Sequence, residues 1–279
     1  LDVSGKLMAD LGRNSWGKTD VRLSKVRRGA DEDDFLDVTA RVSLEGDVGA
    51  AHTDGDNSGV VPTDTMKNTI YGLAQDHLAE DLEEFATLLA GHFLEKDWID
   101  SAEVELSARL WQRVTPTGFI GGGSEHRTAG VTRSRHGTEL RAGIEGLVVL
   151  KTTGSGFAGF PHDEFTILPE AEDRILATSI TATWRYAQLP EDTTSAWQTA
   201  RRALVERFFG DRSESVQHQG WMMGVALLDA VPEIDQVTFR LPNQHHLPFD
   251  LTRFGMDDAG TVFQPVTEPF GDISFTITR

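Results

Sequence analysis

Two short segments, far apart in the chain, carry side chains that could move a proton if folding brings them together. Residues 60–71 read Val-Val-Pro-Thr-Asp-Thr-Met-Lys-Asn-Thr-Ile-Tyr, and residues 241–246 read Leu-Pro-Asn-Gln-His-His. Threonine, asparagine and histidine are weak acids and bases by themselves, but a lysine beside them would complete a proton relay. Lys18 is the candidate base, acting through the hydroxyl of Thr63. The alternative is that Lys18 is a solvated charge at the end of a strand.

The first segment also predicts the start of a helix. A helix start offers backbone N–H groups and the positive end of the helix dipole, so Thr63 and Asp64 could hold an anion there. The alternative is that the side chain of Thr63, Asp64 or Thr65 simply caps the helix. Both arrangements are compatible with the sequence.

Further side chains suit a flat, polar ligand. Arg174 could donate two hydrogen bonds to an oxo group, or it could pair with a carboxylate. Gln217 could bind the edge of a purine, or it could be a surface amide in contact with water. Phe157 is flanked by glycines that would let a ligand approach closely, so its ring is either a stacking platform or part of the core. His245 and His246 are neighbours on an expected strand, so we predict that one lines a site while the other packs.

Other chemistries find less support. Residues 12–19 match the phosphate-loop pattern G-x-x-x-x-G-K-T, but the residues that follow alternate like a strand, whereas such a loop needs a helix there. We therefore predict that residues 16–18 (Trp-Gly-Lys) begin a strand, and nucleotide hydrolysis ranks last among the alternatives. The chain has no cysteine and no H-E-x-x-H pattern among its nine histidines, so metal catalysis is not expected.

Composition disfavours several classes of partner. The formal net charge of −18 argues against nucleic acid, whose phosphates require a basic face, but a local positive site could still hold a small anion. The sequence has no apolar run long enough to span a membrane and no secretory signal, so we expect a cytoplasmic protein. Only six of the 26 basic residues are lysines. This acid excess suits a salty cytoplasm or reflects ordinary drift of composition.

The spacing of apolar residues predicts an α+β protein with two similar halves, at residues 1–150 and 151–279. Alternation predicts strands near residues 36–44, 104–110, 146–151, 180–186, 237–241 and 273–277. Steps of three and four predict helices at residues 64–77, 82–93, 197–208 and 215–230. Loops are expected at residues 28–34, 49–59, 115–128, 188–193 and 255–260. Each half thus repeats strands, two helices and strands.

In their order along the chain, the motifs resemble those of the urate oxidase (uricase) family. The matching motifs are Gly-Lys (17–18), Val-Pro-Thr-Asp (61–64), Lys-Asn-Thr (67–69), Ser-Gly-Phe (155–157), Asp-Arg-Ile-Leu (173–176), Ser-Val-Gln (215–217) and Leu-Pro-Asn-Gln-His (241–245). The resemblance implies the tunnelling fold, in which each half is an antiparallel sheet carrying a helix pair on one face. Dimerisation would close a barrel and remove exposed sheet edges. A homotetramer with active sites between subunits is expected.

The resemblance also implies a reaction, the oxidation of urate by dioxygen to 5-hydroxyisourate and hydrogen peroxide without a cofactor. Lys18, Thr63 and His245 would form the proton relay. The implied substrate-binding residues are Thr63, Asp64, Phe157, Arg174, Val216, Gln217 and Asn243.

Each implied binding residue has its own role. Phe157 would stack on the purine, while Arg174 and Gln217 grip its edge with help from the backbone of Val216. Asn243 and Thr63 would hold dioxygen and then water. Asp64 would reach the ligand from the neighbouring subunit through its backbone N–H.

Trp16, Phe165, Ile167 and Gln244 depart from the family's pattern, but none of them has a role in this scheme. The rate and the pH optimum therefore stay open. The alternative function is a non-catalytic or differently specific purine-binding protein on the same fold. The sequence shows no Ser-Lys-Leu peroxisomal tag, which favours a bacterial or archaeal cytoplasm.

Overall fold

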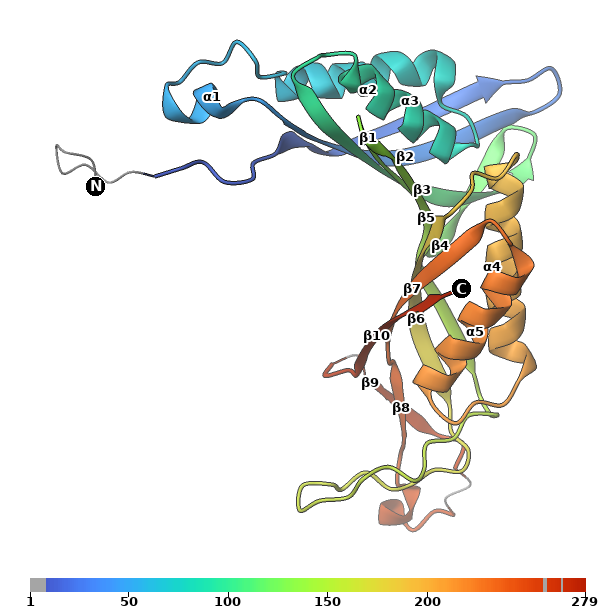
Figure 1. The fold of residues 1–279 in the computed structure, drawn as a ribbon. Coiled ribbons are helices and arrows are strands. Elements are labelled where there is room, and N and C mark those ends of the chain that lie inside the picture. The colour runs from blue at the N-terminus through green and yellow to red at the C-terminus, as the bar shows by residue number, and fades with distance from the viewer. Residues whose placement is uncertain (1–8, 258–259, 267) are drawn as a thin grey trace. The chain divides into compact units, whose positions relative to one another are not determined.

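Strands and helices follow one another along the chain in the order that the apolar periodicity predicts (Figure 1). The computed structural model describes residues 9–257, 260–266 and 268–279. It contains two compact units, one made of Leu1–Ile120 and Ala129–Leu140, the other of Gly121–Thr128 and Arg141–Arg279. The expected α+β class is confirmed, because four strand pairs of the large sheet, two in each unit, run antiparallel and each unit carries helices.

The first unit is built on β1 (Trp16–Arg28), β2 (Asp33–Gly46) and β3 (Ile99–Thr115), paired in that order. Parts of β4 (Gly118–Ser134) and β5 (Gly137–Lys151) also belong to it. Val38, Ala40, Val42 and Leu44 on β2 are almost fully buried. Because alternate residues of a strand share one face, these four mark the core side of the sheet.

The first unit also holds α1 (Gly49–Thr53), α2 (Thr63–His77) and α3 (Leu82–Leu94). Met66 and Ile70 of α2 and Phe85 and Leu89 of α3 are fully buried, so these two helices supply the other side of the core. The carboxylate of Asp81 caps α3 by accepting the N–H of Glu84 at 2.8 Å.

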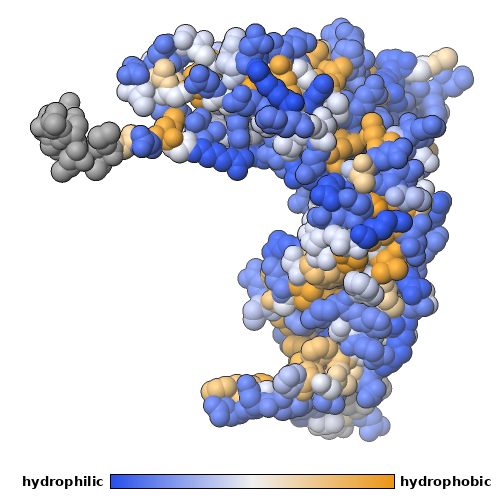
Figure 2. Space-filling model, in the orientation of Figure 1, coloured by the Kyte–Doolittle hydropathy of each residue, from blue (hydrophilic) through white to orange (hydrophobic). Residues whose placement is uncertain are grey.

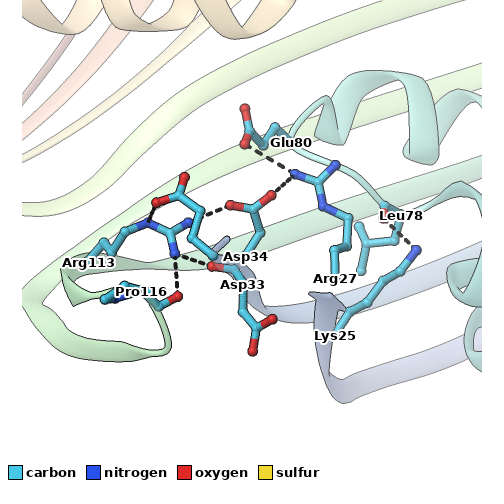
Figure 3. Close-up of polar contacts among 9 residues, drawn as sticks. Lys25, Arg27, Asp33, Asp34, Leu78, Glu80, Arg113 and Pro116 are labelled. Atoms are coloured by element: carbon cyan, nitrogen blue, oxygen red, sulfur yellow. Dashed lines mark hydrogen bonds and ion pairs between the residues drawn. The ribbon is translucent and has the colours of Figure 1, made fainter. Parts of the chain in front are cut away.

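A polar network holds the end of β1 beside the end of α2 (Figure 3). Arg27 lies between two carboxylates, 2.8 Å from Asp34 and 3.3 Å from Glu80. Arg113 of β3 reaches the same Asp34 at 2.6 Å. Lys25 donates its ammonium to the backbone carbonyls of Ala74 and Leu78, both at 2.8 Å. These contacts secure the C-terminal end of α2.

The second unit is built on β6 (Leu176–Tyr186), β7 (Ile234–Pro242) and β10 (Asp272–Thr278), together with the remaining parts of β4 and β5. Helices α4 (Thr193–Gly210) and α5 (Val216–Ala230) lie side by side (Figure 1). A Cβ at Gly220 would come within 2.3 Å of the ring of Phe275. Glycine at this position therefore lets α5 pack closely on β10.

A two-stranded sheet completes the second unit. It consists of β8 (His245–Pro248) and β9 (Phe263–Val266), with the short helix η1 (Leu251–Phe254) between them. No helix within the described residues is long and apolar enough to cross a membrane. The surface seen in Figure 2 is mostly hydrophilic, in keeping with the high charge of the chain.

The predicted helices and strands are confirmed, apart from their ends, but two predicted loops are wrong. Residues 115–128 fall largely in β4, because neighbouring strands supply the hydrogen bonds that a glycine run cannot supply by itself. Residues 49–59 include the short helix α1. The prediction that residues 16–18 begin a strand is confirmed, because β1 starts at Trp16 and continues past Lys18 without the helix that a phosphate loop requires.

Candidate functional site

A loop after β5 presents the ring of Phe157. The carboxylate of Asp173 accepts the backbone N–H groups of Gly154 at 2.8 Å and Ser155 at 3.2 Å, as well as the hydroxyl of Thr153. The hydroxyl of Thr153 and these N–H groups hold the pKa of the Asp173 carboxyl below its usual range. Phe157 then exchanges backbone hydrogen bonds with Ala171, at 2.7 and 2.9 Å. The loop is thus fixed from both ends.

Arg174 brings a positive charge to the same ring. Its guanidinium carbon lies 5.1 Å from the centroid of Phe157, and burial lowers the pKa of Arg174. Among the described residues, no partner accepts a hydrogen bond from the buried Nε of Arg174. The sequence left a carboxylate partner open as an alternative, and no carboxylate in the described part of the chain pairs with this guanidinium. An anionic or oxo-bearing ligand would satisfy it.

The start of α5 lies against the Phe157 loop. Gly156 donates its N–H to the carbonyl of Ser213 at 2.8 Å, and Ser213 donates its N–H to the carbonyl of Gly154 at 3.0 Å. Two residues later, the hydroxyl of Ser215 caps α5 by accepting the N–H of His218 at 3.0 Å. Val216 and Gln217 therefore occupy the first positions of a well-ordered helix start.

Asn243 and His245 enter from the end of β7. Asn243 donates its N–H to the carbonyl of Gly271 at 2.8 Å, and Gln244 donates its N–H to the carbonyl of Ala177 at 2.9 Å. These bonds fix the chain where it leaves β7 for β8. His245 is then the first residue of β8 and pairs with Val266 of β9.

One cavity of about 750 Å³ in the second unit collects these side chains. Six of the nine predicted site residues line it: Phe157, Arg174, Val216, Gln217, Asn243 and His245. His246 lines it as well, so the expectation that only one of the two histidines would face a site is wrong. β8 is only four residues long and pairs with β9 alone, which leaves both of these histidines half-exposed.

The other three predicted residues, Lys18, Thr63 and Asp64, belong to the first unit. Lys18 pairs with Val42 and Val21 pairs with Ala40, so β1 has one extra residue between these pairs. This β-bulge contains Asp20, whose φ of 55° lies in the left-handed region. Val42 and Ala40 share the core face, and the bulge therefore keeps Lys18 on the same face as Val21. Lys18 is half-buried there, which disagrees with a fully solvated charge.

Thr63 and Asp64 are the first two residues of α2, and both are exposed. The N-cap is Pro62, and within the described residues no side chain caps this helix. The alternative that Thr63, Asp64 or Thr65 serves as the cap is therefore wrong. A hydrogen bond and the charge of Lys67 lower the pKa of Asp64, with smaller contributions from Asn68 and Lys18. Lys18 is thus close enough to the start of α2 to be felt electrostatically.

The departures from the family pattern lie in different places. The indole of Trp16 donates to the carbonyl of Val61 at 3.0 Å, which ties the beginning of β1 to the segment before α2. Phe165 and Ile167 are 81% and 95% exposed. In the described part of the chain, no group of three or more histidine, aspartate or glutamate side chains could hold a metal ion.

Comparison of the sequence with known families and proteins finds relatives that are described as uricases. The profile of the family described as Uricase matches residues 14–136 and 140–274. A uricase from Arthrobacter globiformis is 42% identical over 272 residues, covering 96% of this chain and 90% of that protein. A uricase from Dictyostelium discoideum is 38% identical over 282 residues, with 98% of each chain covered.

The fold has a close counterpart among solved structures. The crystal structure of uricase from Arthrobacter globiformis superimposes with a TM-score of 0.94 at 41% identity. The match covers 98% of this chain and 96% of that one. The match therefore extends through both units.

Proposed function

The chain belongs to the uricase family, and from this premise we propose that it oxidises urate through a relay of Lys18, Thr63 and His245. The membership makes it an oxidoreductase that acts on urate. The proposal concerns the products, the residues that carry the reaction and the assembly in which they meet.

The proposed reaction combines urate, dioxygen and water to give 5-hydroxyisourate and hydrogen peroxide. Two electrons pass from the purine to dioxygen, and the oxygen atom added to the purine comes from water. A doubly deprotonated purine is rich enough in electrons to reduce dioxygen itself. The protein then has three tasks, which are to remove protons, to place the reactants and to exclude bulk water.

The cavity of the second unit supports the binding half of the proposal. Phe157 offers a flat ring, Arg174 a half-buried positive charge, and Gln217 an amide that both donates and accepts. With the backbone N–H of Val216, these groups would hold one edge of urate. Asn243 would hold dioxygen, and subsequently water, above the purine.

The half-buried Lys18 and the uncapped start of α2 support the proton-transfer half. Lys18 would draw a proton from urate through the hydroxyl of Thr63, and His245 would complete the relay. Asp64 would bind the ligand through its backbone N–H, with the helix dipole adding to the attraction. We propose that two copies of the chain contribute these halves to one site, in a homotetramer of tunnelling-fold chains with halves at residues 1–150 and 151–279.

The observation that carries the proposal is the convergence of six motif residues, distant in sequence, on one cavity. The test is urate consumption in air-saturated buffer containing a chelator, with peroxide measured in parallel. We expect one peroxide per urate. Urate that stays unchanged while still binding would favour the alternative, a purine-binding protein without this activity.

A further inference from the structure

Lys151, the last residue of β5, makes polar contacts behind the cavity wall. Its ammonium donates to the backbone carbonyl of Asp211 and to the side-chain oxygen of Gln219, both at 2.8 Å. It also lies 5.5 Å from the ring centroid of Phe208. Gln219 is only 1% exposed and donates its amide to the carbonyl of Arg207 at 3.2 Å. Lys151 and Gln219 form what we call the polar clamp.

The polar clamp ties the end of α4 to the first turn of α5. The short segment between its two anchor points, Asp211 and Gln219, carries the groups that shape the cavity. Ser213 in that segment holds the Phe157 loop, and Ser215 caps the helix whose first residues are Val216 and Gln217. Fixing both ends of the segment therefore fixes the position of the purine-edge groups.

Partial burial of the ammonium is unfavourable in itself. Desolvation lowers the pKa of Lys151, with the charge of Asp211 opposing this effect. A methionine of similar length could fill the same space without this cost, but it could not bond to Asp211 and Gln219. The ammonium of Lys151 thus lowers stability by its desolvation, but its hydrogen bonds fix the position of residues 211–219.

We propose that Lys151 and Gln219 are positioning residues, which set the start of α5 for binding of the purine edge. The proposal rests on the proposed function, because it deepens the role of that same cavity. Neither residue needs to touch urate. Their effect would pass through the backbone of residues 211–219 to Val216 and Gln217.

Lys25 of the first unit provides a matched control. Its ammonium also donates to two acceptors at 2.8 Å, the carbonyls of Ala74 and Leu78 at the end of α2. The proposed site uses the opposite end of that helix, at Thr63. Loss of the Lys25 ammonium should therefore lower stability without changing the affinity for a purine.

The test compares Lys151→Met, Gln219→Met, Lys151→Arg and Lys25→Met by steady-state kinetics with urate and by calorimetric binding of xanthine, a purine without the 8-oxo group. We expect Lys151→Met and Gln219→Met to raise KM and the xanthine Kd by about tenfold, a size typical of mutations that act on a site through an intervening network. The kcat should stay near the unchanged protein's value. Lys151→Arg should restore most of the affinity, and a double variant that combines Lys151→Met with Gln219→Met should be no worse than the poorer of the two single variants.

A lower melting temperature and lower kcat with KM and Kd unchanged would show a merely structural role and overturn the proposal. Should Lys151→Met fail to fold, Gln219→Met decides by the same criterion, because it leaves the bond to Asp211 in place. If the unchanged protein does not oxidise urate, the proposed function fails separately, and xanthine binding still tests the polar clamp.

Discussion

The starts of α2 and α5 carry the two halves of the proposed site, and they are built in opposite ways. α5 begins at a serine cap, its first residues line a cavity, and the loops around it are tied down by Asp173 and Ser213. α2 begins at Pro62, with Thr63 and Asp64 exposed to solvent and, within the described residues, no side-chain cap. In the proposed function, the second unit provides a binding pocket whose walls are already held in place by hydrogen bonds. The first unit provides polar groups that would meet the ligand in a site completed by a second copy of the chain.

The largest expected effect falls on the first unit. Replacing Lys18 by Met or Thr63 by Ala should lower kcat by about 10²–10⁴-fold, because each removes a member of the proposed proton relay. Xanthine binding should change much less, since the cavity is intact. Stopped-flow measurement of urate turnover gives kcat, and Lys96→Met, on a lysine outside the site, is the control. Near-normal turnover in either relay variant would refute the assignment of proton transfer to the first unit.

Arg174→Met should separate binding from stability in the second unit. We expect KM to rise about 10–100-fold, because a charged contact to the purine is lost. Thermal stability should rise slightly, by less than about 1 kcal/mol in the free energy of unfolding, since a half-buried cation without a carboxylate partner among the described residues is removed.

Arg185→Met is the matched comparison. Arg185 pairs with Asp235 at 2.7 Å, so this variant should lose stability and keep its KM. If Arg174→Met were destabilised as Arg185→Met is, the guanidinium would have a structural partner after all. Urea unfolding and steady-state kinetics give both quantities.

Removal of the cap on α5 should have a moderate effect. Ser215→Ala should cost about 1 kcal/mol of stability and raise KM severalfold, because the first turn carries Val216 and Gln217. Asp192 caps α4 in the same way, through the N–H of Ser195 at 2.8 Å. Asp192→Ala should therefore cost similar stability without affecting KM. Equal KM values in the two variants would argue against a role of the first turn of α5 in binding.

The smallest effect concerns pH. The folded-state pKa of Asp173 is depressed by Thr153 and the neighbouring N–H groups, so its contribution to stability is present above the unfolded value of about 3.9. This contribution is lost as pH falls through the folded pKa. Because the carboxylate is largely exposed, we expect less than about 1 kcal/mol.

Asp173→Asn tests this contribution against a matched loop carboxylate. The variant should raise KM severalfold at neutral pH, and its stability deficit should vanish in acid. Asp163, which accepts from the N–H of Phe165 at 3.0 Å, offers the control variant Asp163→Asn, with an unaltered KM. A deficit of Asp173→Asn that persists at low pH would assign the effect to packing instead of charge.

Periodicity was sufficient to predict most elements, but it failed where the chain departs from regular alternation. The bulge at Thr19 and Asp20 reverses the expected phase of β1, and strict alternation would have placed Lys18 on the face opposite Val21. The glycines at 121–123 were interpreted as a loop, although they pair within β4. One of the two neighbouring histidines was expected to pack, although both His245 and His246 line the cavity. The polar clamp was missed, because a lone Lys and a lone Gln give no pattern in the sequence.

The sequence by itself determined the family, through motifs in a fixed order along the chain, and the order of the elements, because apolar periodicity is a local property. Only the tertiary structure decided which groups share a cavity, which helix start is capped and which face Lys18 occupies. Those properties follow from hydrogen bonds between residues tens of positions apart, such as Gly156 with Ser213 and Lys151 with Gln219. Such contacts depend on how whole elements pack together, and local periodicity does not predict that packing.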